Sequence, residues 1–163
     1  AAAPEVEWVR ADVREFRRPR AFDAALSMYT SFGYFADAAD DARHATNAFE
    51  SLVPGGAFLI DTMSKEVLAA KYQERQWQEL DDGSRLLSRT TIEDGWRAVR
   101  NEGTLDKGDE RRETCVWNRL YAGTELEALL RGVGFADVRI FGWLDGQPYG
   151  PSARRLVAVA HRR

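Results

Sequence analysis

Two short apolar runs, separated by a helix-length segment, constrain the fold of this chain most strongly. The first run is Phe22–Met28, and the second is Ala57–Asp61, which follows a Pro54-Gly55-Gly56 turn. Apolar runs bounded by turn residues are typical of central strands in parallel sheets. Between them, Ala42–Leu52 carries apolar residues at helical spacing. The sequence therefore predicts two parallel strands joined by a crossover helix, the basic unit of an α/β domain.

The character of the chain changes between Gln76 and Tyr121. Four alternating segments are predicted to be strands: Trp77–Leu80, Leu86–Ile92, Trp96–Leu105 and Arg112–Tyr121. The turn sequences Asp81-Asp82-Gly83-Ser84, Glu93-Asp94-Gly95 and Lys107-Gly108-Asp109 separate them. This pattern indicates an antiparallel β-meander inserted into the α/β domain. We expect one domain over residues 1–163, with residues 62–121 forming an inserted lid.

The remaining elements follow from shorter signals. Val6–Ala11 alternates like a strand, Ser64 is placed to cap a helix from Lys65 to Tyr72, and Thr124 to cap one ending at Arg131. Val138–Phe141 and Arg155–His161 are predicted as the last two strands. Cys115, the single cysteine, excludes an internal disulfide, and its alternating surroundings predict a packed structural thiol.

Composition narrows the class of partner. The chain has 163 residues, 44% of them hydrophobic and 30% charged, with a net charge of −3. This acidic balance gives no electrostatic footprint for nucleic acid. No apolar run is long enough to cross a membrane, and Ala1-Ala2-Ala3-Pro4 lacks a secretion-signal pattern. We therefore expect a cytoplasmic protein that binds neither nucleic acid nor membrane.

The order and spacing of several motifs resemble the class I S-adenosylmethionine (SAM)-dependent methyltransferases. The motifs are Ala11-Asp12, Phe22–Leu26, the Met28–Phe35 loop, Leu52–Gly56 before a strand, and the late stretch Arg119–Phe135. The resemblance implies an incomplete Rossmann-like sheet with an inserted meander. It also implies SAM as the cofactor and transfer of a methyl group to a small-molecule acceptor.

The resemblance also assigns site residues. Asp12 and Val13 correspond to positions that contact adenine, and Met28, Tyr29 and Thr30 to positions beside the methionine end of the cofactor. Substrate-lining candidates are Tyr29, Ser31, Phe32, Tyr34, Trp143 and Tyr149. For the two loop tyrosines and the Trp143–Tyr149 loop, simple packing stays open as the alternative. His44 was weighed as an acceptor-orienting group and is expected to be exposed or to cap a helix.

One departure from the family pattern affects function. The family's first strand, its glycine-rich cofactor loop and the acidic residue after its second strand should precede Val6, where no counterpart stands. Such glycines let the backbone approach the cofactor closely. Two hypotheses follow: a substrate-side methyltransferase portion that is inactive alone, or a non-catalytic remnant that acts as an association module. The strand Phe22–Met28 would have an unpaired edge, so a homodimer or a missing N-terminal half is the expected partner.

Overall fold

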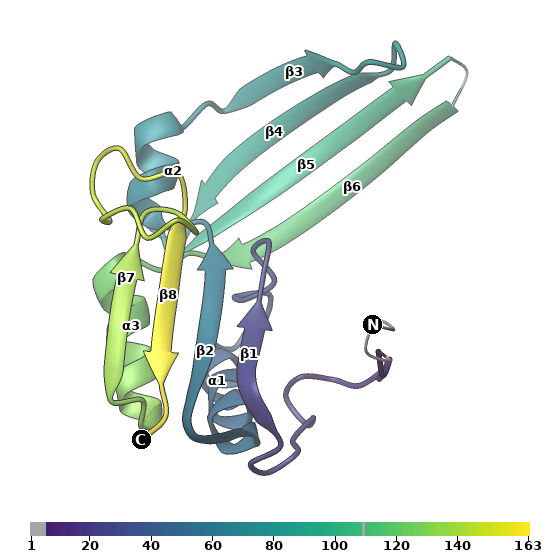
Figure 1. Ribbon diagram of the computed structural model, residues 1–163. Helices are drawn as coiled ribbons and strands as arrows, with labels where there is room; N and C mark the ends of the chain where they lie inside the picture. The colour runs from purple at the N-terminus through teal and green to yellow at the C-terminus, as the bar shows by residue number, and fades with distance from the viewer. Residues whose placement is uncertain (1–5, 109) are drawn as a thin grey trace.

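The computed structural model describes residues 6–108 and 110–163, in which it places three helices and eight strands in two sheets (Figure 1). The Ala1–Pro4 end and Asp109 of the predicted third turn lie outside the described residues. No helix among the described residues is long and apolar enough to span a membrane.

The first sheet has the strand order β1-β2-β8-β7. Its strands are β1 (Phe22–Ser27), β2 (Leu52–Thr62), β7 (Asp137–Phe141) and β8 (Leu156–His161). β1 and β2 are parallel, and β8 is antiparallel to both of its neighbours. The predicted parallel pair and the predicted antiparallel last strand are therefore confirmed.

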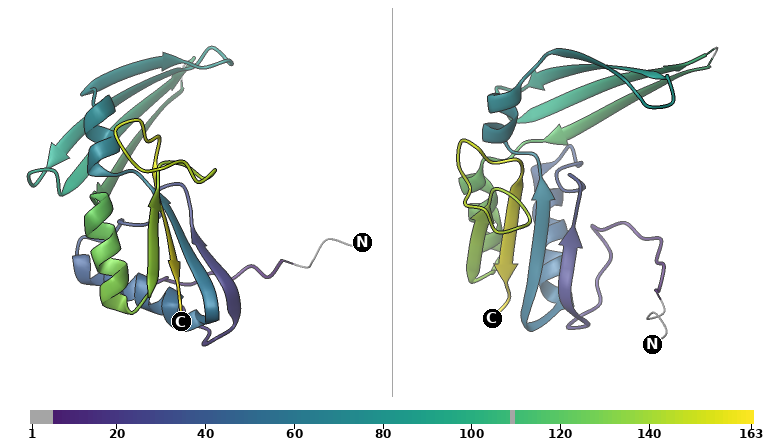
Figure 2. Two further views of the ribbon diagram at one scale, coloured as in Figure 1. Left: turned by 60° about the vertical axis from the view of Figure 1, so that its left-hand side comes forward. Right: turned by 45° about the horizontal axis from the view of Figure 1, so that its top comes forward.

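Two helices, α1 (Ala38–Ser51) and α3 (Gly123–Val133), cover one face of this sheet (Figure 2). Phe58, Ile60 and Leu156 point to that face and are at most 1% exposed. They pack with Leu126 and Leu130 of α3 in the core. Strand side chains alternate between faces, so Leu59 lies on the opposite, uncovered face.

The second sheet is an antiparallel meander in the order β3-β4-β5-β6. Its strands are β3 (Arg75–Glu79), β4 (Arg85–Glu93), β5 (Ala98–Lys107) and β6 (Glu110–Arg119), and α2 (Lys65–Lys71) leads into it. It lies above the carboxyl ends of β1 and β2 (Figure 1). This is the position that a lid requires, because ligands of open α/β sheets bind at that end.

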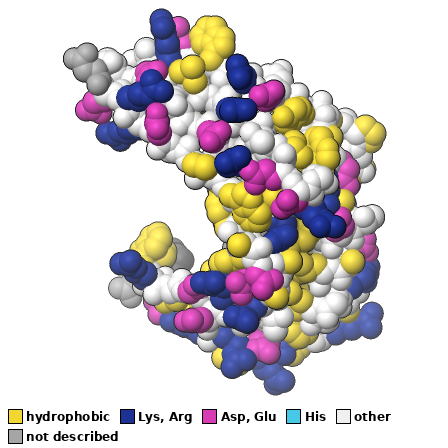
Figure 3. All heavy atoms as spheres, turned by 180° about the vertical axis from the view of Figure 1, so that it is seen from behind, with side chains coloured by type: hydrophobic (Ala, Val, Ile, Leu, Met, Phe, Trp, Pro, Cys, Tyr) yellow, Lys and Arg dark blue, Asp and Glu magenta, His cyan; other side chains and the backbone are white. Residues whose placement is uncertain are grey.

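The N-terminal strand prediction was wrong. Residues 6–11 form no strand but an extended arm, and Val6, Trp8 and Val9 are exposed along it. In the described part of the chain no strand lies beside the arm, so its backbone lacks the ladder that a strand needs. The space-filling view shows the arm standing apart from the second sheet, with a hollow between them (Figure 3).

Three smaller predictions also need correction. α3 begins at Gly123 with Ala122 rather than Thr124 as its N-cap, because the Glu125 carboxylate accepts a hydrogen bond from the Ala122 N–H at 2.8 Å. Cys115 is exposed on β6 and is not packed. His44 is half-buried against the Phe32 ring, with 5.2 Å between ring centroids, so it is neither exposed nor a cap. The Ser64 cap of α2 is confirmed, since its hydroxyl accepts from the Val67 N–H at 3.1 Å.

Candidate functional site

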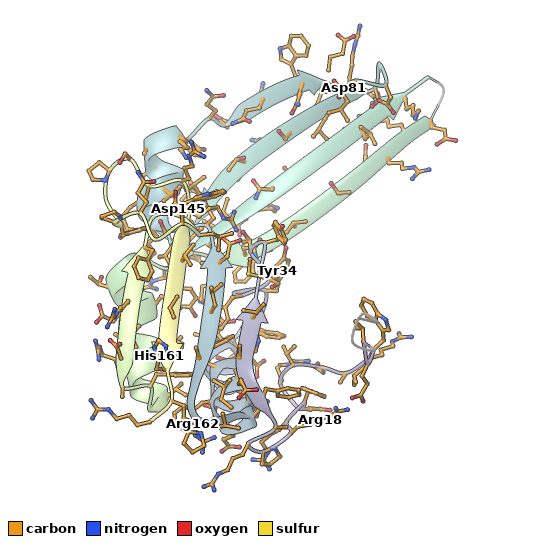
Figure 4. All side chains as sticks on the ribbon, viewed as in Figure 1. Arg18, Tyr34, Asp81, Asp145, His161 and Arg162 are labelled. Carbon is orange, nitrogen blue, oxygen red and sulfur yellow. The ribbon has the colours of Figure 1, made fainter. Side chains whose placement is uncertain are left out.

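The carboxyl end of β1 carries the residues that the sequence singled out. The chain leaves β1 after Ser27 and runs through the loop Met28–Phe35 before α1 begins. Figure 4 places Tyr34 at this end of β1, directly beneath the second sheet. The loop therefore lies between a strand end below and the lid above.

Asp61 at the end of β2 holds the first turn of this loop. Its carboxylate accepts from the Tyr29 N–H at 3.1 Å, and its backbone carbonyl accepts from the Thr30 N–H at 2.9 Å. Tyr29 and Thr30 have φ angles of 55° and 63°. Two consecutive non-glycine residues in the left-handed region are strained. The hydrogen bonds to Asp61 offset that strain and fix the turn.

Arg155 completes this arrangement from the other side of the sheet. Its Nε donates to Asp61 Oδ1 at 2.7 Å, and its Nη2 donates to Thr30 Oγ1 at 2.8 Å. The side chain of Asp61 is only 5% exposed and that of Arg155 19%. A buried carboxylate needs such a partner, because desolvation of an unpaired charge is costly. Asp61, Arg155 and Thr30, the Asp61 clamp, thus bind the loop rigidly to β2.

A second polar cluster ties the lid to α1. Asp41 is fully buried in α1 and accepts from Tyr121 Oη at 2.7 Å and from Arg119 Nε at 3.2 Å. Burial raises the pKa of Asp41, whereas the bonds from Tyr121 and Arg119 lower it. Arg119 ends β6 and also donates to the carbonyls of Phe35 and Ala36. The junction between lid and loop is therefore fixed by charge-assisted hydrogen bonds.

The predicted substrate residues in the loop divide into two groups. Tyr29 is 86% exposed and Tyr34 49% exposed, so both rings face the open space at the end of β1. Phe32 is 1% exposed and packs against His44 and Tyr121, which places it in the core. Ser31 lies within the loop, where its hydroxyl donates to the Met28 carbonyl at 2.7 Å and lies 3.1 Å from Ser27 Oγ.

The late loop between β7 and β8 is anchored beside α2. Tyr149 Oη lies 2.6 Å from Ser64 Oγ and donates to Glu66 Oε2 at 2.9 Å. Burial raises the pKa of Tyr149. Trp143 lies under the Arg154 guanidinium, whose carbon is 5.6 Å from the ring centroid. Figure 4 shows this loop, at Asp145, at the same end of the sheet as Tyr34 but above β8. The structure does not bring the two groups of aromatic residues into contact.

The two predicted adenine contacts lie at the root of the arm. Asp12 forms an ion pair with Arg14 at 2.7 Å, and hydrogen bonds from Arg14 lower the pKa of Asp12 to about 2. The Val13 carbonyl accepts from Asn47 Nδ2 at 2.9 Å. Val13 also lines an apolar cleft of about 130 Å³ together with Leu26 of β1. The roles of all the predicted site residues stay predictions.

Sequence reasoning missed the Asp61 clamp and the Asp41 cluster. Asp61 was recognisable, because a polar residue at the carboxyl end of a parallel strand faces the ligand end of such a sheet. Arg155 and Arg119 gave no comparable signal, because their partners lie 94 and 78 residues away along the chain.

Gly33 gives a direct test of how tightly the loop meets the lid. Its φ is 98°, its carbonyl accepts from the Arg119 N–H at 2.7 Å, and a Cβ would lie 2.8 Å from the Arg119 carbonyl oxygen. We expect Gly33→Ala to lower the free energy of unfolding by about 2 kcal/mol in urea titrations. The matched control is Gly83→Ala, which has φ 78° with nothing near its Cβ and should cost about 1 kcal/mol. Equal losses would show that the lid contact is not tight.

Comparisons with known proteins agree on the fold. No protein-family model matches the chain, and no curated protein matches it by sequence. Solved structures do match. A SAM-dependent methyltransferase from Clostridium acetobutylicum matches with TM-score 0.79 and 17% identity, over 94% of this chain and 63% of that one. The CcbJ methyltransferase from Streptomyces caelestis matches with TM-score 0.81 and 15% identity, over 94% and 62%.

A third match is SAM-bound CalS10, an amino pentose methyltransferase from Micromonospora echinaspora, with TM-score 0.68 and 19% identity over 94% and 63% of the two chains. The chain has the fold of class I SAM-dependent methyltransferases. It spans about 63% of the length of these structures. Within this methyltransferase fold, β1 and β2 with the lid above them form the candidate site.

Proposed function

We propose that this chain is the acceptor-side portion of a SAM-dependent methyltransferase that acts on a small molecule, with an amine such as an amino sugar as the acceptor class. The observation that carries the proposal is the match over 94% of the chain to methyltransferase structures, one of which acts on an amino pentose. The loop Met28–Phe35, held rigidly under a lid at the ligand end of the sheet, supports it.

In this proposal the residues of the chain position the acceptor. Bound SAM would supply an electrophilic methyl group, so the main task of the protein is to hold the acceptor in line with it. Tyr29 and Tyr34 expose their rings at the mouth of the site and would line it. The Asp61 clamp would keep Tyr29 in place, since it fixes the backbone of that residue.

The residues fit the cofactor only in part. Val13 and Leu26 line an apolar cleft that suits the edge of an adenine ring, and Met28–Thr30 lies at the strand end. The Asp12 carboxylate, however, is already engaged by Arg14. Two or three polar contacts contribute roughly 1.5–3 kcal/mol each, against an association cost of about 4–15 kcal/mol. We therefore expect the 163-residue chain to bind SAM weakly and to be inactive alone.

Amide chemical shifts of the labelled chain, titrated with SAM, test this proposal. We expect millimolar binding, with shifts concentrated on Val13 and Met28–Thr30 and not on the exposed tip of the lid around Gly83. ATP, which shares the adenosine but lacks the methionine, should shift Val13 and leave Thr30 unchanged. Micromolar binding would overturn the weak-binding part, and no shift at millimolar SAM would overturn the assignment to a SAM enzyme.

A second candidate function is an association module without catalysis. The observation that favours it is the unpaired outer edge of β1, where Leu26 is 66% exposed. The same titration separates the two functions, because a pure association module gives no localised response to SAM.

A further inference from the structure

The outer edge of β1 is open to another strand. Among the described residues β1 pairs with β2 alone, and it ends the sheet on that side. Leu26 at its centre is 66% exposed, and the strand has only one charged residue, Asp23. Sheet edges in native proteins are usually blunted by lysine, proline, a bulge or a covering segment. The outer edge of β1 carries no lysine or proline, and its register irregularity lies at the start of the strand.

The ground beside this edge is apolar and hollowed. Val13, Phe16, Phe22 and Leu26 are among the residues that line the cleft of about 130 Å³ between β1, α1 and the root of the arm. A wider hollow of about 510 Å³ lies between Phe22 and arm residues that include Trp8. A strand that added to β1 would therefore find an apolar floor for its side chains.

The same chain carries a segment with the matching chemistry. Residues 6–11 are extended and alternate like a strand, but no backbone hydrogen bond within the described residues involves them. Trp8 is 90% exposed, Val6 65% and Val9 48%. This sequence has the β-propensity of a strand and lacks only a neighbour with which to pair.

The root of the arm is fixed so that the arm points away from its own β1. Arg14 forms ion pairs with Asp12 and with Asp40 of α1, and the Ala21 N–H donates to the Ser51 carbonyl at 2.9 Å. Beyond this root the arm projects from the body, as Figures 1 and 3 show. A free strand and a free edge thus exist in one chain without meeting.

We propose that two copies of this chain exchange their arms, so that Val6–Ala11 of each copy adds as a strand to the outer edge of β1 of the other. A reciprocal exchange about a twofold axis satisfies both edges and both arms in one closed dimer. The backbone hydrogen bonds supply affinity, as in strand addition to open sheet edges, and the side chains of Val6, Trp8 and Val9 become available to cover Leu26. This inference is independent of the methyltransferase proposal.

Light scattering on the purified chain, in line with gel filtration, tests the exchange. We expect a dimer for the unaltered chain and a monomer for Trp8→Glu and for Leu26→Lys, because each places a charge in the exchanged interface. The matched controls are Trp77→Glu and Leu87→Lys on the lid, whose residues are 71% and 47% exposed. Both controls should remain dimeric. Circular dichroism of each variant shows whether it is folded, which separates loss of the interface from loss of the fold.

Crosslinking identifies the occupant of the edge. In a Cys115→Ser background, Trp8→Cys and Leu26→Cys are made as separate proteins and treated with a short bismaleimide. We expect a covalent dimer only when the two proteins are mixed. Three results would overturn the proposal: an unaltered chain that is monomeric, a dimer that survives both interface variants, or a Trp8→Cys, Leu26→Cys double variant that crosslinks only within one chain.

Discussion

Arg119→Met should lower the free energy of unfolding by about 4 kcal/mol at neutral pH, one of the two largest effects expected for this chain. The guanidinium is 17% exposed and pairs with Asp41, whose side chain is fully buried. Removing one partner of a buried ion pair leaves the other charge uncompensated, which typically costs 3–5 kcal/mol. The variant also loses the donors to the Phe35 and Ala36 carbonyls at the end of the loop. Urea unfolding followed by circular dichroism measures the loss.

The pH dependence of this loss shows that Asp41 is its source. Burial raises the pKa of Asp41, so the folded protein holds that proton more tightly than the unfolded chain does. Stability from this group is therefore greatest at acid pH and declines as pH rises through the raised pKa. Without Arg119 the pKa rises further, so the difference between variant and unaltered protein should be widest at neutral pH and shrink on acidification.

The control for this experiment is Arg111→Met on the same strand. The Arg111 side chain is 65% exposed and pairs only with surface carboxylates. Surface pairs contribute little, so this variant should stay within about 0.5 kcal/mol of the unaltered protein. A pH-independent loss for Arg119→Met would show that its aliphatic packing, and not its charge, matters.

Local signals carried most of the fold. The apolar runs of β1 and β2, the Pro54-Gly55-Gly56 turn and the turns of the meander depend on neighbours in sequence, and each element was predicted to within a few residues. The start of β2 is an exception, because the strand continues back through the turn to Leu52. Pairing with β1 begins there, at Phe22 opposite Leu52, and this long-range contact has no local signature.

The site was less predictable, because its fixed points are contacts between distant segments. The exposure of Tyr29 and Tyr34 followed from their place in a loop after a parallel strand. The burial of Phe32 did not, since it depends on packing against Tyr121, which arrives from the far end of the lid. The arm failed for the opposite reason. Its sequence favours a strand, but strand formation requires a partner that its own chain does not bring beside it.

Arg155→Met should cost about 3 kcal/mol of unfolding free energy and should loosen the loop at the candidate site. The substitution leaves Asp61, 5% exposed, with the Tyr29 N–H as its remaining hydrogen-bond donor in the clamp. It also frees the Thr30 hydroxyl from its 2.8 Å bond. A buried carboxylate without its cation destabilises the fold by several kcal/mol, and the left-handed turn at Tyr29 and Thr30 then loses one of the contacts that offset its strain.

Two measurements separate the global effect of Arg155→Met from the local one. Urea unfolding gives the stability, and amide hydrogen exchange at Thr30 under native conditions reports opening of the turn. We expect Thr30 to exchange faster in the variant, while Ile60 in the middle of β2 changes only as much as global stability requires. Arg154→Met, at the exposed neighbouring position that stacks on Trp143, is the matched control and should leave Thr30 unchanged.

A double variant decides whether the charge pair itself holds the turn. Asp61→Asn with Arg155→Met removes both charges, so its loss should be smaller than the sum of the two single losses, by at least about 1 kcal/mol. Additive losses, with Thr30 exchange unaltered in Arg155→Met, would mean that the turn is held by the Asp61 backbone carbonyl alone. The Asp61 clamp would then be a stabilising contact of the sheet with no part in shaping the site.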